Sequence, residues 1–268
     1  MQLLYDSELG QTGPRPPGPD APAPLSIGEV SDRELVGLYR HRLGDDGGVW
    51  LRSNFITTLD GSIAGPDGRA GSINTSSDHR IFALHRAHAD AVLVGAQTVR
   101  SEHYRAVDLA PWQREIRVAE GLSHFPTLAV VTRSLDLDPG LARHGDREVG
   151  MVVVFTTSGK SRTALAPFTA AGVEVVQLAG GDVDLAEVTR QLAVRGCRRL
   201  LAEGGPRLHH DLLARHLVDE MSLSLAPMLV GGDSGRTTAG EWLAEATFRL
   251  RFLLHADDET LFLNYTRS

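Results

Sequence analysis

Cysteine and lysine each occur only once in this chain, and each scarcity excludes a class of protein. Cys197 is the only cysteine among 268 residues, so an internal disulfide is impossible and a reducing cytoplasm is the expected location. Lys160 is the only lysine, and the arginines that carry most of the positive charge form no basic block. With a formal net charge of −7, the chain is not expected to bind nucleic acid.

Long hydrophobic runs are also lacking. No apolar run approaches the roughly 20 residues that span a bilayer. The first residues, MQLLYDSELG, lack the basic start and apolar core of a signal peptide. A hydrophobic content of 42% with 23% charged residues is typical of a globular protein, and the length allows one large domain or two small ones. We therefore expect no membrane segment.

Three catalytic signatures are absent. The segment VLVGAQTVRSE supplies only Gly95, whereas the Rossmann dinucleotide fingerprint requires three glycines. No G-x-S-x-G elbow is present, which argues against acyl transfer. His79, His85 and His88 are spaced by six and three residues, unlike the paired histidines of a zinc protease helix. No metal site is expected.

Composition divides the chain near residue 49. Six prolines between Gly10 and Pro24 exclude a helix or central strand there and indicate an extended, exposed connection. Ser31 followed by Glu34 forms the pattern of a capping box, which predicts a short helix. We therefore expect an N-terminal extension over residues 1–48 and one domain over 49–268.

Apolar strand-like runs alternate with helical patterns from residue 49 onward. Several of these runs are continuously apolar, as in strands buried on both faces of a parallel sheet. The alternation predicts an α/β fold with a mostly parallel central sheet and helices on both faces. The last strands follow one another without a helix between them, which predicts an antiparallel C-terminal edge. The expected strands are 49–56, 90–95, 127–132, 151–156, 173–178, 198–203, 217–227, 247–254 and 259–266, and the expected helices are 76–88, 96–102, 185–195 and the one that begins at Pro206.

The segment LLAEGG followed by PRLHHDLLARHL is the strongest local signal. Gly204 and Gly205 let a ligand approach the backbone, and Pro206 suits the first position of a helix. The free N–H groups at that helix N-terminus favour an anion such as a diphosphate. Glu203 ends the preceding strand, where open α/β sheets place their ligands. A plain strand-to-helix turn is the alternative reading.

Two weaker motifs accompany it. Thr98 and Glu102 are four residues apart on a predicted helix, so a hydroxyl and a carboxylate share one face, which is also typical of a solvated helix surface. TTLDGSIAG places Thr57 and Asp60 after a strand, where Asp-Gly by itself indicates a tight turn.

Four segments in order resemble the riboflavin-pathway pyrimidine reductase family: SNFITTLDGSIAG, DHRIFALHRAHADAVLVGAQTVRSE, LLAEGGPRLHHDLL and LVDEMSLSLAPMLVGG. The resemblance covers residues 49–266 and implies a fold similar to that of dihydrofolate reductase. Nothing in the chain resembles the family's deaminase domain, so we expect a stand-alone reductase. The resemblance implies that NADPH delivers hydride to the ribosyl C1′ of a ribosylaminopyrimidinedione 5′-phosphate and opens the sugar, a reaction that depends on positioning.

The resemblance also implies roles for individual residues. Glu203 faces the substrate ring and Arg86 its phosphate, with Glu203 and Asp60 as the suspected proton donors. Arg105 is a candidate replacement for an arginine that the family uses at the sugar phosphate. General electrostatics add Thr132 and Arg133 as a candidate site for the 2′-phosphate. The cofactor set expected from motifs, resemblance and electrostatics is Thr57, Asp60, Gly95, Thr98, Glu102, Thr132, Arg133, Gly204, Gly205, Pro206 and Arg207.

Two departures from the family pattern keep other substrates open. Ser62 stands where the family commonly has lysine, and residues 102–121 replace a segment that helps to hold the sugar phosphate. One alternative is a reductase of dihydrofolate or another pterin or heterocycle, and another is an NADPH-binding protein without catalysis. The family resemblance also implies a homodimer, which is the commonest oligomer of soluble proteins.

Overall fold

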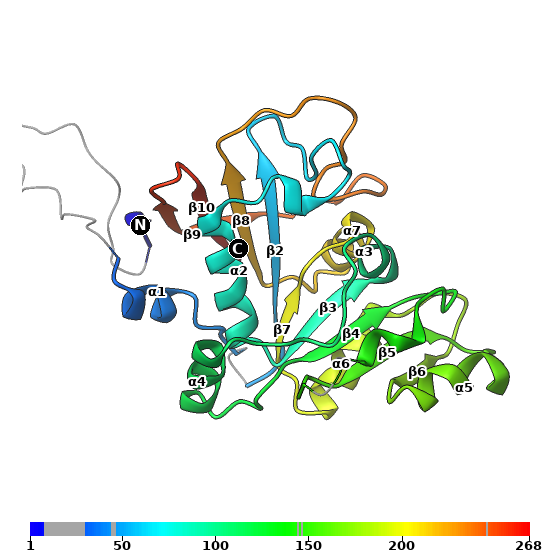
Figure 1. The fold of residues 1–268 in the computed structure, drawn as a ribbon. Helices are drawn as coiled ribbons and strands as arrows, with labels where there is room; N and C mark the ends of the chain where they lie inside the picture. The colour runs from blue at the N-terminus through cyan, green and yellow to red at the C-terminus, as the bar shows by residue number, and fades with distance from the viewer. Residues whose placement is uncertain (8–29, 44–46, 144, 146, 245) are drawn as a thin grey trace, which may run out of the picture.

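The computed structural model describes residues 1–7, 30–43, 47–143, 145, 147–244 and 246–268. Within these residues ten strands form one sheet in the order β1-β9-β10-β8-β2-β7-β3-β4-β5-β6 (Figure 1). The strands are β1 (Gln2–Asp6), β2 (Trp50–Thr58), β3 (Ala91–Gly95), β4 (Thr127–Val131), β5 (Val152–Thr157), β6 (Glu174–Leu178), β7 (Arg199–Ala202), β8 (Glu220–Ala226), β9 (Phe248–His255) and β10 (Leu261–Arg267). From β8 to β6 all neighbours are parallel, whereas β10, β9 and β1 add an antiparallel edge.

Helices cover both faces of this sheet. They are α1 (Asp32–Leu38), α2 (Ser76–His88), α3 (Ala96–Ser101), α4 (Pro111–Ala119), α5 (Arg162–Ala170), α6 (Leu185–Val194) and α7 (Pro206–Ala214), with the 3-10 turns η1 (Ala70–Ser72) and η2 (Pro139–Ala142). No helix in the described part of the chain is long and apolar enough to cross a membrane.

Alternate residues of the parallel strands feed two cores, because successive side chains of a strand point to opposite faces. In β3, Ala91 and Leu93 pack on the face covered by α6 and α7. Val92 and Val94 pack on the opposite face, with Val99 of α3 and Phe168 of α5. Burial on both faces explains why these strands are continuously apolar. The predicted α/β class with its antiparallel C-terminal edge is confirmed.

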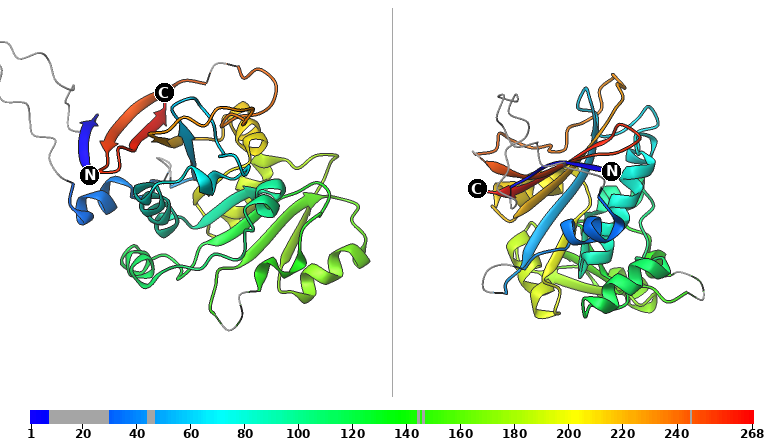
Figure 2. Two further views of the ribbon diagram at one scale, coloured as in Figure 1. Left: turned by 45° about the horizontal axis from the view of Figure 1, so that its top comes forward. Right: turned by 90° about the vertical axis from the view of Figure 1, so that its left-hand side faces the viewer.

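The N-terminal residues contribute to the same fold. β1 pairs with β9, although no strand was expected in this segment. The predicted capping box is present, since Ser31 Oγ accepts from Glu34 N and Glu34 Oε2 accepts from Ser31 N. Both chain ends lie at the antiparallel side of the sheet, where β1 begins and β10 ends (Figure 2). The proline-rich residues 10–24 fall outside the described part, and the division near residue 49 stays a prediction.

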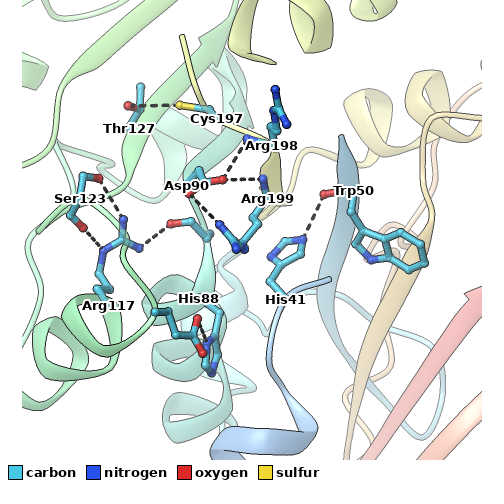
Figure 3. A network of polar contacts seen from close by, with 12 residues as sticks. His41, Trp50, His88, Asp90, Arg117, Ser123, Thr127, Cys197, Arg198 and Arg199 are labelled. Carbon is cyan, nitrogen blue, oxygen red and sulfur yellow. Dashed lines mark hydrogen bonds and ion pairs between the residues drawn. The ribbon is translucent and has the colours of Figure 1, made fainter. Parts of the chain in front are cut away.

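A polar network fixes the amino ends of the central strands (Figure 3). The Asp90 carboxylate accepts from the backbone N–H groups of Arg198 and Arg199, at 2.9 and 2.7 Å, and so links the start of β3 to the start of β7. The buried Arg117 of α4 donates to carbonyls at the C-terminal end of α2 and to Ser123. Because internal contacts occupy this end of the strands, a ligand site is expected at the opposite end.

Candidate active site

A cleft of about 1140 Å³ opens at the carboxyl ends of β2, β7 and β3. Its walls are α2, α3 and the turn after β7, and two loops, 63–71 and 230–235, border it. The carboxyl ends of parallel strands are the usual ligand position in open α/β sheets. The cleft therefore occupies the expected place for a substrate and a cofactor.

One stripe of α2 faces this cleft. Asp78, Phe82 and Arg86 follow one another at intervals of four residues, and all three line the cleft. Residues at this spacing lie on one face of a helix. The remaining apolar residues Ile81 and Leu84 point into the core against β9 and β10. The helix thus presents a carboxylate, an aromatic ring and a guanidinium in a row.

Glu203 and Arg86 form a bidentate ion pair at the base of the cleft. Arg86 Nε donates to Glu203 Oε1 and Arg86 Nη2 to Glu203 Oε2, both at 2.7 Å. The Tyr104 hydroxyl donates to Glu203 Oε2 at 3.0 Å. The guanidinium also lies 4.4 Å from the centre of the Phe82 ring, a cation–π contact. The Glu203 side chain is completely buried, so its position is fixed by these partners.

Packing around Glu203 determines the pKa shifts of Arg86 and Tyr104. Burial would lower the pKa of Arg86, but the charge and hydrogen bonds of Glu203 raise it above its ordinary value. Burial and the Glu203 charge raise the pKa of Tyr104 well above its ordinary value, so its hydroxyl keeps its proton. Glu203 therefore acts as the acceptor in every one of these contacts.

The turn between β7 and α7 has the conformation that glycine permits. Gly204 and Gly205 have φ angles of 131° and 84°, and a Cβ added to Gly205 would lie 3.2 Å from Thr98 Oγ1. Pro206 begins α7, and no side chain caps that helix. Uncapped N–H groups and the helix dipole favour an anion at this point. The turn therefore fits a diphosphate.

Comparison with known proteins identifies the family. The model of the RibD C-terminal domain matches residues 49–261. The chain belongs to the RibD C-terminal domain family. The predicted resemblance is thus confirmed.

Named relatives agree with this assignment. A 2,5-diamino-6-ribosylamino-4(3H)-pyrimidinone 5′-phosphate reductase of Methanothermobacter thermautotrophicus is 31% identical, over 80% of this chain and 95% of its own length. The riboflavin biosynthesis protein PYRR of Arabidopsis thaliana is 30% identical over 70% of this chain, a match that spans 29% of that protein. The structure of a pyrimidine reductase-like protein from Corynebacterium diphtheriae has a TM-score of 0.71 at 24% identity, covering 82% of this chain and 92% of its own. That likeness shows the shared fold.

The cleft of this RibD C-terminal domain brings together about half of the residues expected from the sequence. The expected residues that line it are Arg86, Thr98, Glu102, Arg105, Glu203, Gly204, Gly205 and Pro206. Glu102 Oε1 accepts from the backbone N–H of Ala70 at 3.3 Å and so ties α3 to η1. Arg105 Nη2 pairs with Asp138 Oδ2 at 3.0 Å. Their proposed ligand roles stay predictions.

Asp60 and Thr57 lie outside this cleft, beside a smaller depression of about 370 Å³. Asp60 Oδ2 accepts from the backbone N–H groups of Val230 and Gly231, at 3.1 and 2.7 Å, and Oδ1 accepts from the Thr58 hydroxyl. The Thr58 hydrogen bond, followed by that of Gly231, lowers the pKa of Asp60. These contacts hold two loops together, and the expected roles of Asp60 as a proton donor and of Asp60 and Thr57 at the cofactor stay predictions.

The other expected residues lie around the cleft rather than in it. Gly95 N is 3.8 Å from the position that a Cβ on Gly205 would take. Thr132 is buried and accepts from Leu135 N at 3.2 Å, while the exposed Arg133 has Asp182 as its neighbour at 3.8 Å. Arg207 is exposed on α7. Nothing in these positions tests their cofactor roles, which stay predictions.

Sequence reasoning missed Tyr104, Phe82 and Asp78. The spacing of Asp78, Phe82 and Arg86 was available as a signal, because residues four apart share a helix face. The contact between Tyr104 and Glu203 had no such signal, since 99 residues separate the two.

Proposed function

We propose that this chain is an NADPH-dependent reductase that transfers a hydride to the ribosyl C1′ of a ribosylaminopyrimidine 5′-phosphate. The observation that carries the proposal is the Glu203–Arg86 pair beside the Gly204–Gly205 turn, in one cleft of a chain of the RibD C-terminal domain family. The names of relatives, which include 2,5-diamino-6-ribosylamino-4(3H)-pyrimidinone 5′-phosphate reductase, support the substrate class.

The residues present fit a dinucleotide. The cradle that a Cβ would fill at Gly205 and the uncapped start of α7 suit a diphosphate, and Thr98 lies beside them. NADPH, when bound, supplies the hydride. Selection of its 2′-phosphate by Thr132 and Arg133 belongs to this proposal.

The protein's own part is to hold the ring and stabilise charge. As the bond between C1′ and the ring oxygen breaks, its electron pair stays on the oxygen, which takes up a proton from water, and positive charge develops on the carbon–nitrogen unit that accepts the hydride. In this proposal the buried Glu203 carboxylate, held by Arg86 and Tyr104, stabilises that positive charge. Glu203 is thus an electrostatic group in this proposal, not the proton donor that the sequence suggested.

A second candidate substrate is a dihydropterin, which carries no phosphate. Among the described residues that line the cleft, the arginines are Arg86 and Arg105, and each already has a carboxylate partner. A phosphate would have to compete with Glu203 or Asp138 for them. This arrangement is the observation that favours the pterin.

Loss of nicotinamide absorbance during turnover tests the proposal. Purified protein is given NADPH with the ribosylaminopyrimidine phosphate, with its dephosphorylated form, or with dihydrofolate. Oxidation with the phosphorylated pyrimidine supports the proposal, and oxidation with dihydrofolate alone moves the protein to the pterin class. NADPH binding without oxidation by any of the three would identify a non-catalytic binding protein.

Two further statements stay predictions of the sequence, namely a homodimer and a cytoplasmic location. Light scattering of the purified chain tests the first, and a mass of twice 28.9 kDa is expected.

A further inference from the structure

Asp78 is a buried carboxylate of the cleft, and no described residue supplies a cation to pair with it. Asp78 is only 4% exposed. None of the ion pairs among the described residues involves its carboxylate. The other buried carboxylate of the cleft, Glu203, is paired with Arg86, and Asp108 at the rim is paired with Arg147 at 3.0 Å. A buried carboxylate without a counter-ion is unfavourable, which makes Asp78 a candidate to bind the hydrogen-bond donors of a ligand.

Two further polar side chains line the same cleft. Asn54 and Asn74 both line it, and the side-chain Oδ1 atoms of both are buried without a hydrogen-bond partner among the described residues. Asn54 is only 8% exposed and lies two residues from Arg52 on β2, so the two side chains point to the same face of the sheet. On that face Arg52 contacts His85 of α2. The strand and the helix thus bring an amide and a carboxylate to the same cleft.

Phe82 lies one helical turn beyond Asp78 on the same stripe, next to the Arg86 guanidinium. A flat heterocycle that contacts Phe82 would turn one edge toward Asp78. Burial raises the pKa of Asp78, and the Ser224 hydroxyl and the His79 charge lower it only in part, so donors on that edge would add to the stabilisation of the carboxylate.

Two ring edges found in ribosylaminopyrimidines differ in how they meet a carboxylate. A 2-amino-4-oxopyrimidine presents two adjacent donors, N3–H and the 2-amino group, which match the two carboxylate oxygens. A uracil presents N3–H between two carbonyl oxygens, so the second carboxylate oxygen would face a lone pair.

We propose that Asp78 selects substrates with a 2-amino-4-oxopyrimidine ring over those with a uracil ring. The inference rests on the proposed function, because it names the ring class that the same cleft accepts. It differs from the sequence-based expectation, which assigned a pyrimidinedione. Dihydropterins carry the same 2-amino-4-oxo edge, so Asp78 would hold a pterin in the same way.

The test compares kcat/KM for the 2-amino-4-oxo and the uracil forms of the ribosylaminopyrimidine phosphate, with dihydrofolate as a third substrate. Wild-type protein is expected to favour the 2-amino ring by about tenfold to a hundredfold, the range of one or two hydrogen bonds to a charged group. In Asp78→Asn the side chain offers one acceptor and one donor, which match N3–H and a uracil carbonyl. This variant is therefore expected to lose activity on the 2-amino ring and to gain on the uracil ring.

Asp258→Asn is the matched control. Asp258 Oδ2 accepts from Ser77 N at 2.9 Å, at the same end of α2, but it does not line the cleft. Its charge raises the pKa of Asp78, so its replacement favours the charged form of Asp78 and should not weaken the preference for the 2-amino ring. Circular dichroism of both variants checks that α2 is intact.

The outcomes separate this inference from the proposed function. Turnover of both rings at equal efficiency, with the ratio unaffected in Asp78→Asn, would overturn the role of Asp78 and leave the reductase proposal standing. Absence of turnover with either ring would overturn the proposed function. In that case calorimetric affinities for the two ring types, in wild type and Asp78→Asn, still decide whether Asp78 discriminates. Activity on dihydrofolate alone, abolished in Asp78→Asn, would assign the same edge recognition to a pterin.

Discussion

Glu203 accepts hydrogen bonds from two side chains at once, so its replacement by glutamine tests its charge separately from its shape. In Glu203→Gln one amide hydrogen would face an Arg86 N–H, and the guanidinium would lose its charged partner. We expect kcat to fall by about tenfold to a hundredfold, the value of a charge-assisted hydrogen bond, while the NADPH dissociation constant is unchanged. Steady-state kinetics and a fluorescence titration with NADPH measure the two quantities.

Tyr104→Phe is the control for this substitution. It removes one hydrogen bond to Glu203 but keeps the ion pair with Arg86, so a smaller loss of kcat is expected. Loss of NADPH binding in Glu203→Gln, with turnover per bound cofactor intact, would instead assign Glu203 to the cofactor.

His209 makes the stability of the fold depend on pH. Its side chain is 1% exposed, Nδ1 lies 2.9 Å from the Thr237 carbonyl oxygen, and burial lowers its pKa from 6.5 to about 4. The unfolded chain therefore binds this proton more readily than the folded one. The contribution of His209 to the free energy of unfolding is complete above pH 6.5 and is lost as the pH falls toward 4. At 1.36 kcal/mol per pKa unit, this loss amounts to about 3 kcal/mol.

His209→Asn can keep a donor to Thr237 but cannot take up the proton. Urea unfolding of wild type and variant is measured at neutral pH and near the acid end of that range. The difference between their unfolding free energies should shrink as the pH falls. Parallel pH profiles would show that His209 does not carry this dependence.

At the scale of secondary structure, the turn between β7 and α7 is the element on which the cofactor proposal depends. Gly205→Ala would place a Cβ in the left-handed region and 3.2 Å from Thr98 Oγ1. The backbone strain costs about 1–2 kcal/mol, and the contact with Thr98 adds to it. We expect lower stability and weaker NADPH binding, measured by urea unfolding and fluorescence titration.

Two further variants divide that loss. Gly121→Ala has the same kind of positive φ, 69°, but its Cβ meets nothing within 4 Å, so it should show the strain alone. Adding Thr98→Ala to Gly205→Ala should recover the steric part and leave the strain. If Gly205→Ala were no worse than Gly121→Ala, close packing against Thr98 would not constrain the turn.

Which elements the sequence could predict depends on where their side chains lie. The parallel strands were predictable because both of their faces are buried, and α7 because Gly204, Gly205 and Pro206 mark its start. Helix α4 could not be predicted from hydrophobic spacing, because its buried residues are the polar Gln113 and Arg117. The site divides in the same way, since the glycine turn is local whereas Arg86 and Glu203 meet across 117 residues. Such a contact has no local pattern.

At the scale of the whole molecule, one buried ion pair joins the parallel and antiparallel parts of the sheet. Arg52 of β2 and Glu220 of β8 are both completely buried, with Nε and Oε1 2.9 Å apart. Asn264 of β10 donates to Glu220 Oε1 at 2.7 Å. Arg52 Nη1 also approaches His85 Nδ1 of α2 at 3.1 Å. The pair therefore fixes the strand and the helix that carry Asn54 and Asp78 to the cleft.

Glu220→Gln is expected to destabilise the fold by about 3–5 kcal/mol, because it leaves the Arg52 charge buried without a counter-ion. The double variant Arg52→Met with Glu220→Leu removes both charges, so it should recover a large part of that loss in urea unfolding. Recovery would be incomplete, since the Trp50 indole N–H, now 2.8 Å from Glu220 Oε2, and the Asn264 amide would lose their acceptor. A double variant as unstable as Glu220→Gln would mean that the neutral groups left unpaired, which also include the Tyr39 and Arg40 carbonyls that accept from Arg52, determine the loss rather than the buried charge. Because α2 is anchored to the sheet through the same network, activity in both variants should fall before the chain unfolds.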